Sequence, residues 1–76
     1  MEIKEFIQNF ADQFEETDTL EFTTETVFHD LDEWSSLIGL SIIAMIDDEY
    51  GVTIKGDELR SAKTILDVYN IVRSKA

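Results

Sequence analysis

Residues 33–51 read Glu-Trp-Ser-Ser-Leu-Ile-Gly-Leu-Ser-Ile-Ile-Ala-Met-Ile-Asp-Asp-Glu-Tyr-Gly, and this stretch sets the architecture of the chain. A polar segment ends at two serines, after which Ser36 to Tyr50 form an apolar run that predicts one helix. Gly51 predicts the end of that helix, because glycine takes the left-handed conformation that is common after a helix C-terminus. A serine at a helix N-terminus most often caps a backbone N–H group. The same position, with its unpaired N–H groups and partial positive charge, also suits a covalently attached phosphate.

The helix predicted from Ser36 to Tyr50 has two different faces when its residues are spaced at roughly 100° per step. One face is mostly apolar and is expected to meet the core: Gly39, Ile42, Ile43, Ile46 and Tyr50. The opposite face mixes apolar and acidic residues: Leu37, Leu40, Ser41, Ala44, Asp47 and Asp48. Exposed apolar contact gives affinity and charge steers encounter, so this outward face is predicted to dock a partner. The alternative is that Leu40 packs under the preceding loop.

The segment before this helix predicts one further helix and a long loop. Apolar residues recur at three- and four-residue steps and predict one stripe of a first helix: Ile3, Phe6, Ile7, Phe10, Ala11 and Phe14. Residues 17–35 have no sustained period and are rich in threonine and acids, which predicts a loop. We expect a short helical turn near residues 24–28. Four apolar residues are expected to hold the loop to the core: Phe22, Val27, Phe28 and Leu31.

The C-terminal third predicts a connector and two more helices. Residues 52–54 alternate apolar and polar and predict a short extended connector. Asp57 is expected to cap a brief third helix that runs through Arg60. Thr64 and Asp67 have the spacing of a capping box and predict the start of the last helix. Its core stripe is expected to consist of Ile65, Val68, Tyr69 and Val72.

Length and charge restrict the class of protein. The 76 residues predict a single domain over residues 1–76, with a formal net charge of −11 and no cysteine. Residues 1–35 carry eleven acidic side chains and one lysine, which disfavours nucleic acid and favours proteins with basic patches as partners. The longest apolar run, residues 42–46, is too short to span a bilayer, and no basic region precedes an apolar signal core. We expect a cytoplasmic monomer in which any thiol chemistry comes from a cofactor.

Residue types used in enzyme and metal sites occur between residues 29 and 36. His29 and the two serines match part of a nucleophilic triad, but no glycine elbow surrounds either serine. His29 is the only histidine, so a histidine-based metal site lacks a second anchor. Asp30 and Asp32 resemble the opening of a calcium loop, yet serines stand where that loop needs glycine and glutamate. We therefore expect neither an enzyme nor a metal site.

Several features occur together along residues 3–72, which is nearly the whole chain. They are an acidic four-helix pattern with a long first loop, a Ser36-Leu37 dipeptide that opens the second helix, an acid cluster before Tyr50, and a last helix that begins at Thr64. This combination resembles the acyl carrier protein family. The family motif is Asp-Ser-Leu, and the corresponding residues here are Ser35-Ser36-Leu37.

The resemblance implies an all-α, up-down four-helix bundle with a short third helix. It implies that Ser36 carries a phosphopantetheine arm, transferred from coenzyme A by a phosphopantetheinyl transferase (holo-synthase). The thiol of the arm would hold acyl groups as thioesters for fatty-acid or related polyketide or specialised lipid biosynthesis. The other expected partners are acyl-transferring and condensing enzymes with basic docking patches. The acyl cargo is expected to enter a pocket between the helices, lined by Phe28, Ile46, Leu59 and Ile65.

The chain departs from the family pattern at several positions. Ser35 replaces an aspartate that the family associates with the transferase and its metal ion, which bears on loading efficiency. Ile38 and Ser41 stand where many members have acids, so recognition is expected to depend more on apolar contacts. Trp34 either shields the base of the arm or packs the loop against the second helix. Two other functions stay open: an unmodified acidic interaction module, and an aminoacyl or peptidyl carrier.

Overall fold

The computed structural model describes residues 1–76 and contains four α-helices and no β-strand. The helices are α1 (Ile3–Ala11), α2 (Ser36–Tyr50), α3 (Gly56–Ser61) and α4 (Ile65–Lys75). Two short 3-10 helices, Thr19–Glu21 and Phe28–Asp30, lie between α1 and α2. The predicted all-α class is confirmed. None of the helices combines the length and apolar character that crossing a membrane requires.

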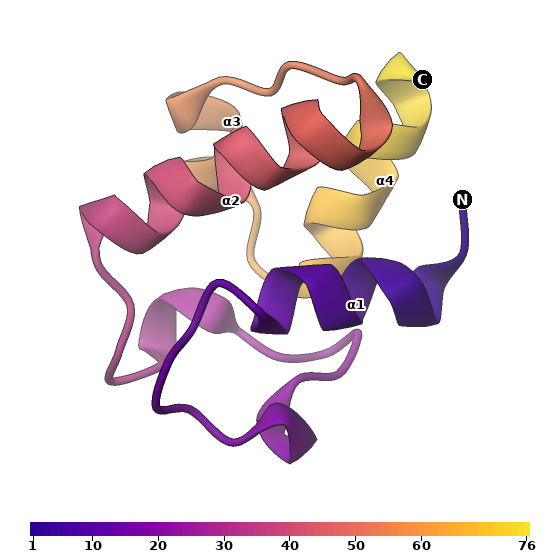
Figure 1. Cartoon of the computed structure of the whole chain (residues 1–76). Coiled ribbons are helices and arrows are strands. Elements are labelled where there is room, and N and C mark those ends of the chain that lie inside the picture. The colour runs from indigo at the N-terminus through magenta and orange to yellow at the C-terminus, as the bar shows by residue number, and fades with distance from the viewer.

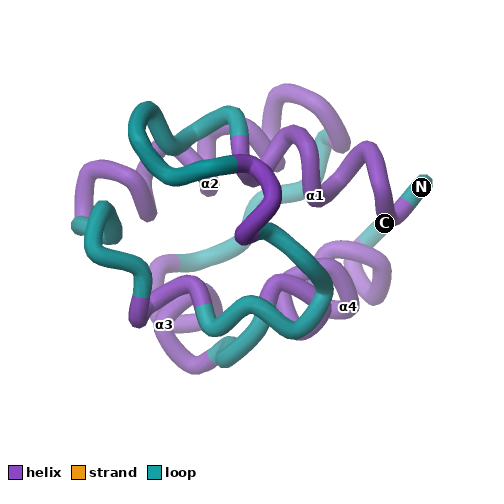
Figure 2. Tube along the Cα trace, turned by 90° about the horizontal axis from the view of Figure 1, so that it is seen from below, coloured by secondary structure: helices purple, strands orange, loops and turns teal.

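The helices surround one apolar core (Figure 1). α1 contacts α2 and α4, and α2 contacts α3. In Figure 1, α1 and α2 lie one above the other and run in opposite directions. Both views place the two chain termini at the same end of the molecule (Figures 1 and 2). There the Tyr69 hydroxyl donates to the Met1 carbonyl at 2.8 Å, so α4 holds the N-terminal residue.

α1 is shorter than the predicted apolar stripe. It ends at Ala11, and a turn at residues 12–13 follows. Phe14 lies just after that turn, and its N–H donates to the Ala11 carbonyl at 2.9 Å. Phe14 is nevertheless buried, with its ring 6.1 Å from that of Phe10 and 4.9 Å from that of Phe22. The prediction that Phe14 lies on the helix is therefore wrong. The prediction that it belongs to the core is confirmed.

The long loop differs from its prediction in the position of its helical turn. Residues 24–27 are not helical, and the 3-10 turn runs from Phe28 to Asp30, so it begins only at the last residue of the predicted range. The Thr26 hydroxyl accepts from the Thr23 N–H at 2.8 Å and donates to the Glu21 carbonyl at 2.7 Å. Such side-chain bonds offer the backbone an alternative to a helix. Phe28 is buried as predicted, whereas Val27 is 39% exposed and does not anchor the loop in the core.

The loop instead reaches the start of α4. The Thr26 carbonyl accepts from the Ile65 N–H at 3.2 Å, and the Thr24 carbonyl accepts from the Leu66 N–H at 3.0 Å. The predicted capping box is confirmed, because the Thr64 hydroxyl accepts from the Asp67 N–H and the Asp67 carboxylate accepts from the Thr64 N–H. The first N–H groups of α4 are thus satisfied within the chain. All four predicted core residues of this helix are buried: Ile65, Val68, Tyr69 and Val72.

α2 has the predicted bounds, and α3 differs from its prediction at the first turn. Gly51 has a φ of 65°, in the left-handed region, and its N–H donates to the Asp47 carbonyl. Asp57 does not cap α3, because it lies inside the helix and Lys55 occupies the cap position. The Glu58 carboxylate accepts from the Lys55 N–H at 2.9 Å and so satisfies the cap from within the helix. A glutamate three residues after the cap can do this regardless of the side chain at the cap itself.

Candidate functional site

The two serines at the start of α2 have separate roles. Ser35 has an extended backbone, and its Oγ accepts from the Ile38 N–H at 3.3 Å. Ser36 is the first residue of the helix, is exposed, and its hydroxyl makes no hydrogen bond within the chain. The capping role therefore belongs to Ser35. The Ser36 hydroxyl is available for chemistry, which the sequence alone left open.

The N-terminus of α2 is also electrostatically different from those of the other helices. α1, α3 and α4 each have an acidic residue in the first turn, and α2 has none. The loop carbonyls that bond the first N–H groups of α4 have no counterpart at α2. The N–H groups of Ser36 and Leu37 are consequently unpaired within the chain. A negatively charged group on Ser36 would lie at the positive end of the helix dipole without a competing carboxylate.

A pocket of about 280 Å³ lies beside Ser36, between α2 and α3. Its wall is largely apolar and consists of Trp34, Ser36, Gly39, Leu40, Ile43, Gly56, Leu59 and Arg60. Gly39 is the buried residue of α2 that keeps this space open. A Cβ atom at that position would come within 3.5 Å of the Trp34 ring and 3.6 Å of a Leu59 methyl group. The site therefore combines a free hydroxyl with an adjoining apolar recess.

Trp34 connects this pocket to the long loop. Its ring centroid lies 5.1 Å from that of Phe28 and 4.9 Å from that of His29. The ring also borders the pocket next to Ser36. Both predicted roles of Trp34 are compatible with this position, because one edge packs the loop and another faces the site. In the sequence these two roles are alternatives, whereas one position of the ring allows both.

His29 is held by aromatic rings rather than by polar groups. Its ring lies edge-on to Phe28 at 4.3 Å, and its Nε2 is buried without a hydrogen-bond partner. No hydrogen bond joins His29 to Ser35, Ser36 or an aspartate. The residue types of a nucleophilic triad are therefore not assembled here. No group of three or more histidine and acidic side chains is arranged to hold a metal ion.

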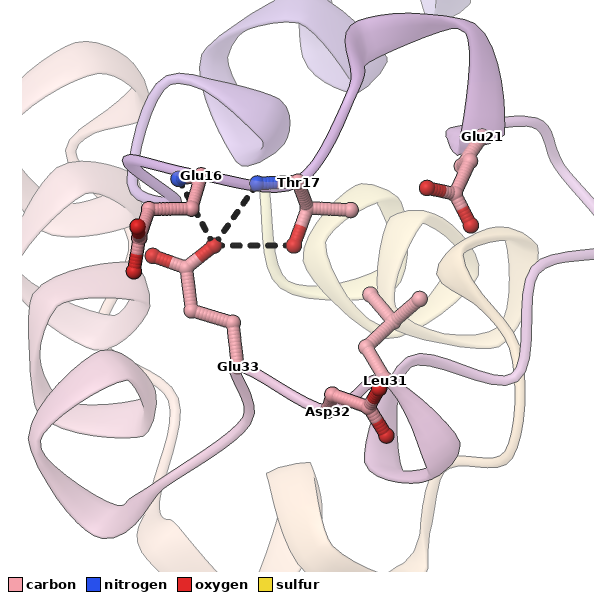
Figure 3. A pocket seen from close by; sticks show the side chains of 6 residues that line it. All are labelled: Glu16, Thr17, Glu21, Leu31, Asp32 and Glu33. Atoms are coloured by element: carbon pink, nitrogen blue, oxygen red, sulfur yellow. Dashed lines mark hydrogen bonds between the residues drawn. The ribbon is translucent and has the colours of Figure 1, made fainter.

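Glu33 forms a hydrogen-bonded clamp that sequence analysis missed. Its carboxylate accepts from the backbone N–H group of Glu15 at 2.6 Å. It also accepts from the N–H groups of Glu16 at 3.0 Å and Thr17 at 2.9 Å and from the Thr17 hydroxyl at 2.8 Å, the three bonds drawn in Figure 3. Desolvation raises the pKa of Glu33, but these hydrogen bonds together outweigh it and hold the pKa below its usual value. The clamp ties the chain after α1 to the residues just before Ser36. An acid before a helix is common, so no sequence signal marks this role.

An acidic hollow of about 410 Å³ adjoins the clamp (Figure 3). It is lined by Glu16, Thr17, Glu21, Leu31, Asp32 and Glu33. The Glu33 carboxylate already accepts four hydrogen bonds, three of them from the wall residues Glu16 and Thr17. The hollow thus reflects how the loop is tied down and adds nothing to the chemistry available at Ser36.

The outward face of α2 is exposed as predicted. Leu37 is 76% exposed and Leu40 is 63% exposed, so Leu40 is not covered by the loop. The remaining predicted members are exposed as well: Ser41, Ala44, Asp47 and Asp48. Three of these residues border a shallow hollow of about 330 Å³ on this face: Ser41, Ala44 and Asp48. Apolar and acidic groups therefore share one accessible helix face.

The residues predicted to hold an acyl chain lie at different depths. Phe28, Ile46 and Ile65 are fully buried in the packed core. Leu59 alone among the four also lines the pocket beside Ser36. Access to the other three requires side chains to move apart, so the cargo site stays a prediction.

The arrangement offers three things in one place: an unbonded hydroxyl, an open helix N-terminus and an apolar recess. An exposed helix face with acids continues from it. Comparisons of the chain with protein-family models, with characterised proteins and with solved structures find no match.

Proposed function

We propose that this chain is an acyl carrier whose Ser36 holds a phosphopantetheine arm. The observation that carries the proposal is the exposed Ser36 hydroxyl, which makes no hydrogen bond at the first residue of α2. The order of one helix, a long loop, a fifteen-residue helix, a six-residue helix and a final helix is compatible with an acyl-carrier-like up-down bundle. A carrier needs no catalytic cleft of its own. It needs an attachment point that other enzymes can reach.

The residues around Ser36 fit a phosphodiester. The unpaired N–H groups of the first turn and the helix dipole favour an anion, and no acid stands in that turn. Ser35 caps the helix and leaves the Ser36 oxygen unbonded. The arm, when bound, supplies the thiol that a chain without cysteine lacks. Trp34 and Leu59 offer apolar surface to the part of the arm nearest the attachment point.

Delivery to enzymes is proposed to use the outward face of α2. Leu37 and Leu40 would supply apolar contact, and Asp47 and Asp48 would steer basic patches on a transferase or on acyl-transferring and condensing enzymes. When a partner docks, the acyl cargo would leave the space between α2 and α3. Burial of the cargo stabilises it by only roughly 25 cal/mol per Å² of apolar surface, so the binding of a partner can reverse it. An acyl carrier and an aminoacyl or peptidyl carrier would differ in the chemical group that is attached to the thiol of the arm.

A second candidate is an interaction module that is never modified. The specific observation in its favour is that Leu37 and Leu40 are exposed in the chain without any arm on Ser36. This candidate leaves the unbonded Ser36 hydroxyl without a role. It predicts a stable partner complex with the unmodified chain.

Intact-mass measurement after incubation with coenzyme A and a broad-specificity phosphopantetheinyl transferase tests the proposal. We expect one added arm, absent in Ser36→Ala and retained in Ser35→Ala. Ser35→Asp is the matched control, because aspartate preserves the cap while restoring the family residue. If active transferases leave the wild-type chain unmodified, or if Ser36→Ala still gains the arm, the carrier proposal is wrong.

A further inference from the structure

Arg60 is the one basic side chain that borders a pocket. The chain has six lysine and arginine residues, and of these only Arg60 lines any of the three hollows on the surface. The pocket that it lines is the one beside Ser36. We infer that Arg60 is the counter-ion that pairs with the phosphodiester of the arm and directs the arm into this pocket. This inference rests on the proposed attachment at Ser36.

The Arg60 guanidinium is unpaired. The one salt bridge of the chain joins Lys75 to Glu58 at 3.1 Å, and Arg73 lies over the Tyr69 ring at 5.6 Å. The Arg60 side chain makes no ion pair and no hydrogen bond, so all five of its N–H donors are available. No carboxylate lines the pocket to compete for them.

Gly56 places the guanidinium at the pocket wall. Arg60 lies one helical turn after Gly56, and its Nη1 lies 3.3 Å from the point where a Cβ of residue 56 would be. A side chain at position 56 would push the guanidinium outward, whereas glycine lets it lie against the backbone. The cation is thereby held toward the first turn of α3, where the helix dipole gives it no stabilisation. An anion in the pocket would provide that stabilisation.

The phosphodiester is the anion that best fits this geometry. Arginine presents a planar fork of donors that matches phosphate oxygens, which lysine does not. Ser36 and Arg60 border the same pocket of about 280 Å³, so a phosphate on the Ser36 oxygen would share that pocket with the guanidinium. A carboxylate at the far end of an acyl cargo is the competing anion, and the arm would have to fold back on itself to bring that carboxylate to Arg60. The tethered phosphate has the higher effective concentration at Arg60.

NMR on the loaded protein tests the pairing, with intact mass as an independent check that loading has occurred. The variants are Arg60→Gln, which removes the charge, and Arg60→Lys, which keeps the charge without the fork. Arg73→Gln is the matched control, because it removes a guanidinium outside the pocket. The readouts are the ³¹P resonance of the arm and the Nε–Hε resonance of Arg60 in apo and loaded protein.

We expect the Arg60 Nε–Hε signal to shift on loading. We also expect the ³¹P signal to differ from that of the same loaded protein unfolded in urea, in which the phosphodiester is intact but the pairing is lost. In Arg60→Gln the ³¹P signal should move toward that of the unfolded loaded protein, and the ratio of arms held at the pocket to arms in solvent should fall up to about five-fold, as for the loss of an exposed ion pair. Arg60→Lys should be intermediate, Arg73→Gln should match wild type, and added salt should mimic Arg60→Gln.

A fully loaded protein whose ³¹P signal is the same in wild type and Arg60→Gln would overturn this inference and leave the carrier proposal intact. A wild-type protein that no transferase loads would overturn both.

Discussion

Replacing Gly39 with alanine and replacing Gly51 with alanine should change the free energy of unfolding in opposite directions. Gly39 lies inside α2, where alanine is favoured over glycine by about 1 kcal/mol. The new methyl group would meet Trp34 at 3.5 Å and Leu59 at 3.6 Å, which is ordinary contact distance. Burying it adds about 0.8 kcal/mol. We therefore expect Gly39→Ala to stabilise the fold by about 1–2 kcal/mol, which raises Tm by roughly 4–15 °C for a domain of this size.

Gly51→Ala is the internal control. No atom lies within 4 Å of a Cβ built there, so its effect is purely conformational. With φ at 65°, alanine must adopt the left-handed region at a cost of about 1–2 kcal/mol. Thermal and urea unfolding monitored by circular dichroism would measure both variants.

A destabilised Gly39→Ala would refute the reasoning, because it would mean that the gap between Trp34 and Leu59 is too narrow for a methyl group. If the expected gain is found, glycine at this position lowers stability and keeps the pocket beside Ser36 open. Loading of Ser36 should be unaffected in Gly39→Ala, since Ser36 is exposed and the atoms nearest to the new methyl group belong to Trp34 and Leu59. Reduced loading together with increased stability would show that the pocket is used during attachment.

Three further predictions concern the clamp, the core and the outward face. Because hydrogen bonds hold the pKa of Glu33 below its ordinary value of 4.5, its stabilising effect is present above that pH and is lost as pH falls through the lowered value. In Glu33→Gln the urea midpoint of unfolding should therefore fall less than in wild type as the pH is lowered from neutral. The same fall in both proteins would show that the Glu33 hydrogen bonds do not stabilise the fold. Ile65→Ala, at a fully buried position, should cost about 2–5 kcal/mol in urea unfolding, and a cost near zero would mean that the core is loosely packed there. Leu37→Asp, at a position 76% exposed, should change stability by less than about 0.5 kcal/mol and raise the KM of the loading transferase. An unchanged KM would argue against docking through Leu37.

Local patterns predicted α2 and α4 well because their signals are contained in a few adjacent residues. Glycine after Tyr50 specifies the end of α2, and Thr64 with Asp67 specifies the start of α4. The exposed face of α2 followed from helical geometry alone. Met45 was not assigned to the core, although it is buried, because its angular position borders both faces.

The errors lie where distant residues compete with local preference. The long loop was expected to turn at residues 24–28, but the carbonyls of Thr24 and Thr26 accept from the first N–H groups of α4. Their partners are about forty residues away in sequence, so no local pattern reveals them. Asp57 has the residue type of a cap, but Glu58 satisfies that end of α3 instead.

The sequence by itself determined the helical class, the limits of α2, the sharing of one face by apolar and acidic groups, and the placement of two serines at a helix start. These follow from hydrophobic period and capping chemistry, which act over one or two helical turns. Only the tertiary structure decided that Ser35 is bonded while Ser36 is free, and that Gly39 opens a recess between Trp34 and Leu59. It also decided that Arg60 borders this recess and that Glu33 ties the chain after α1 to the residues before Ser36. Each of these depends on hydrogen-bond geometry or on contacts between elements far apart in the chain, which residue type and spacing do not encode.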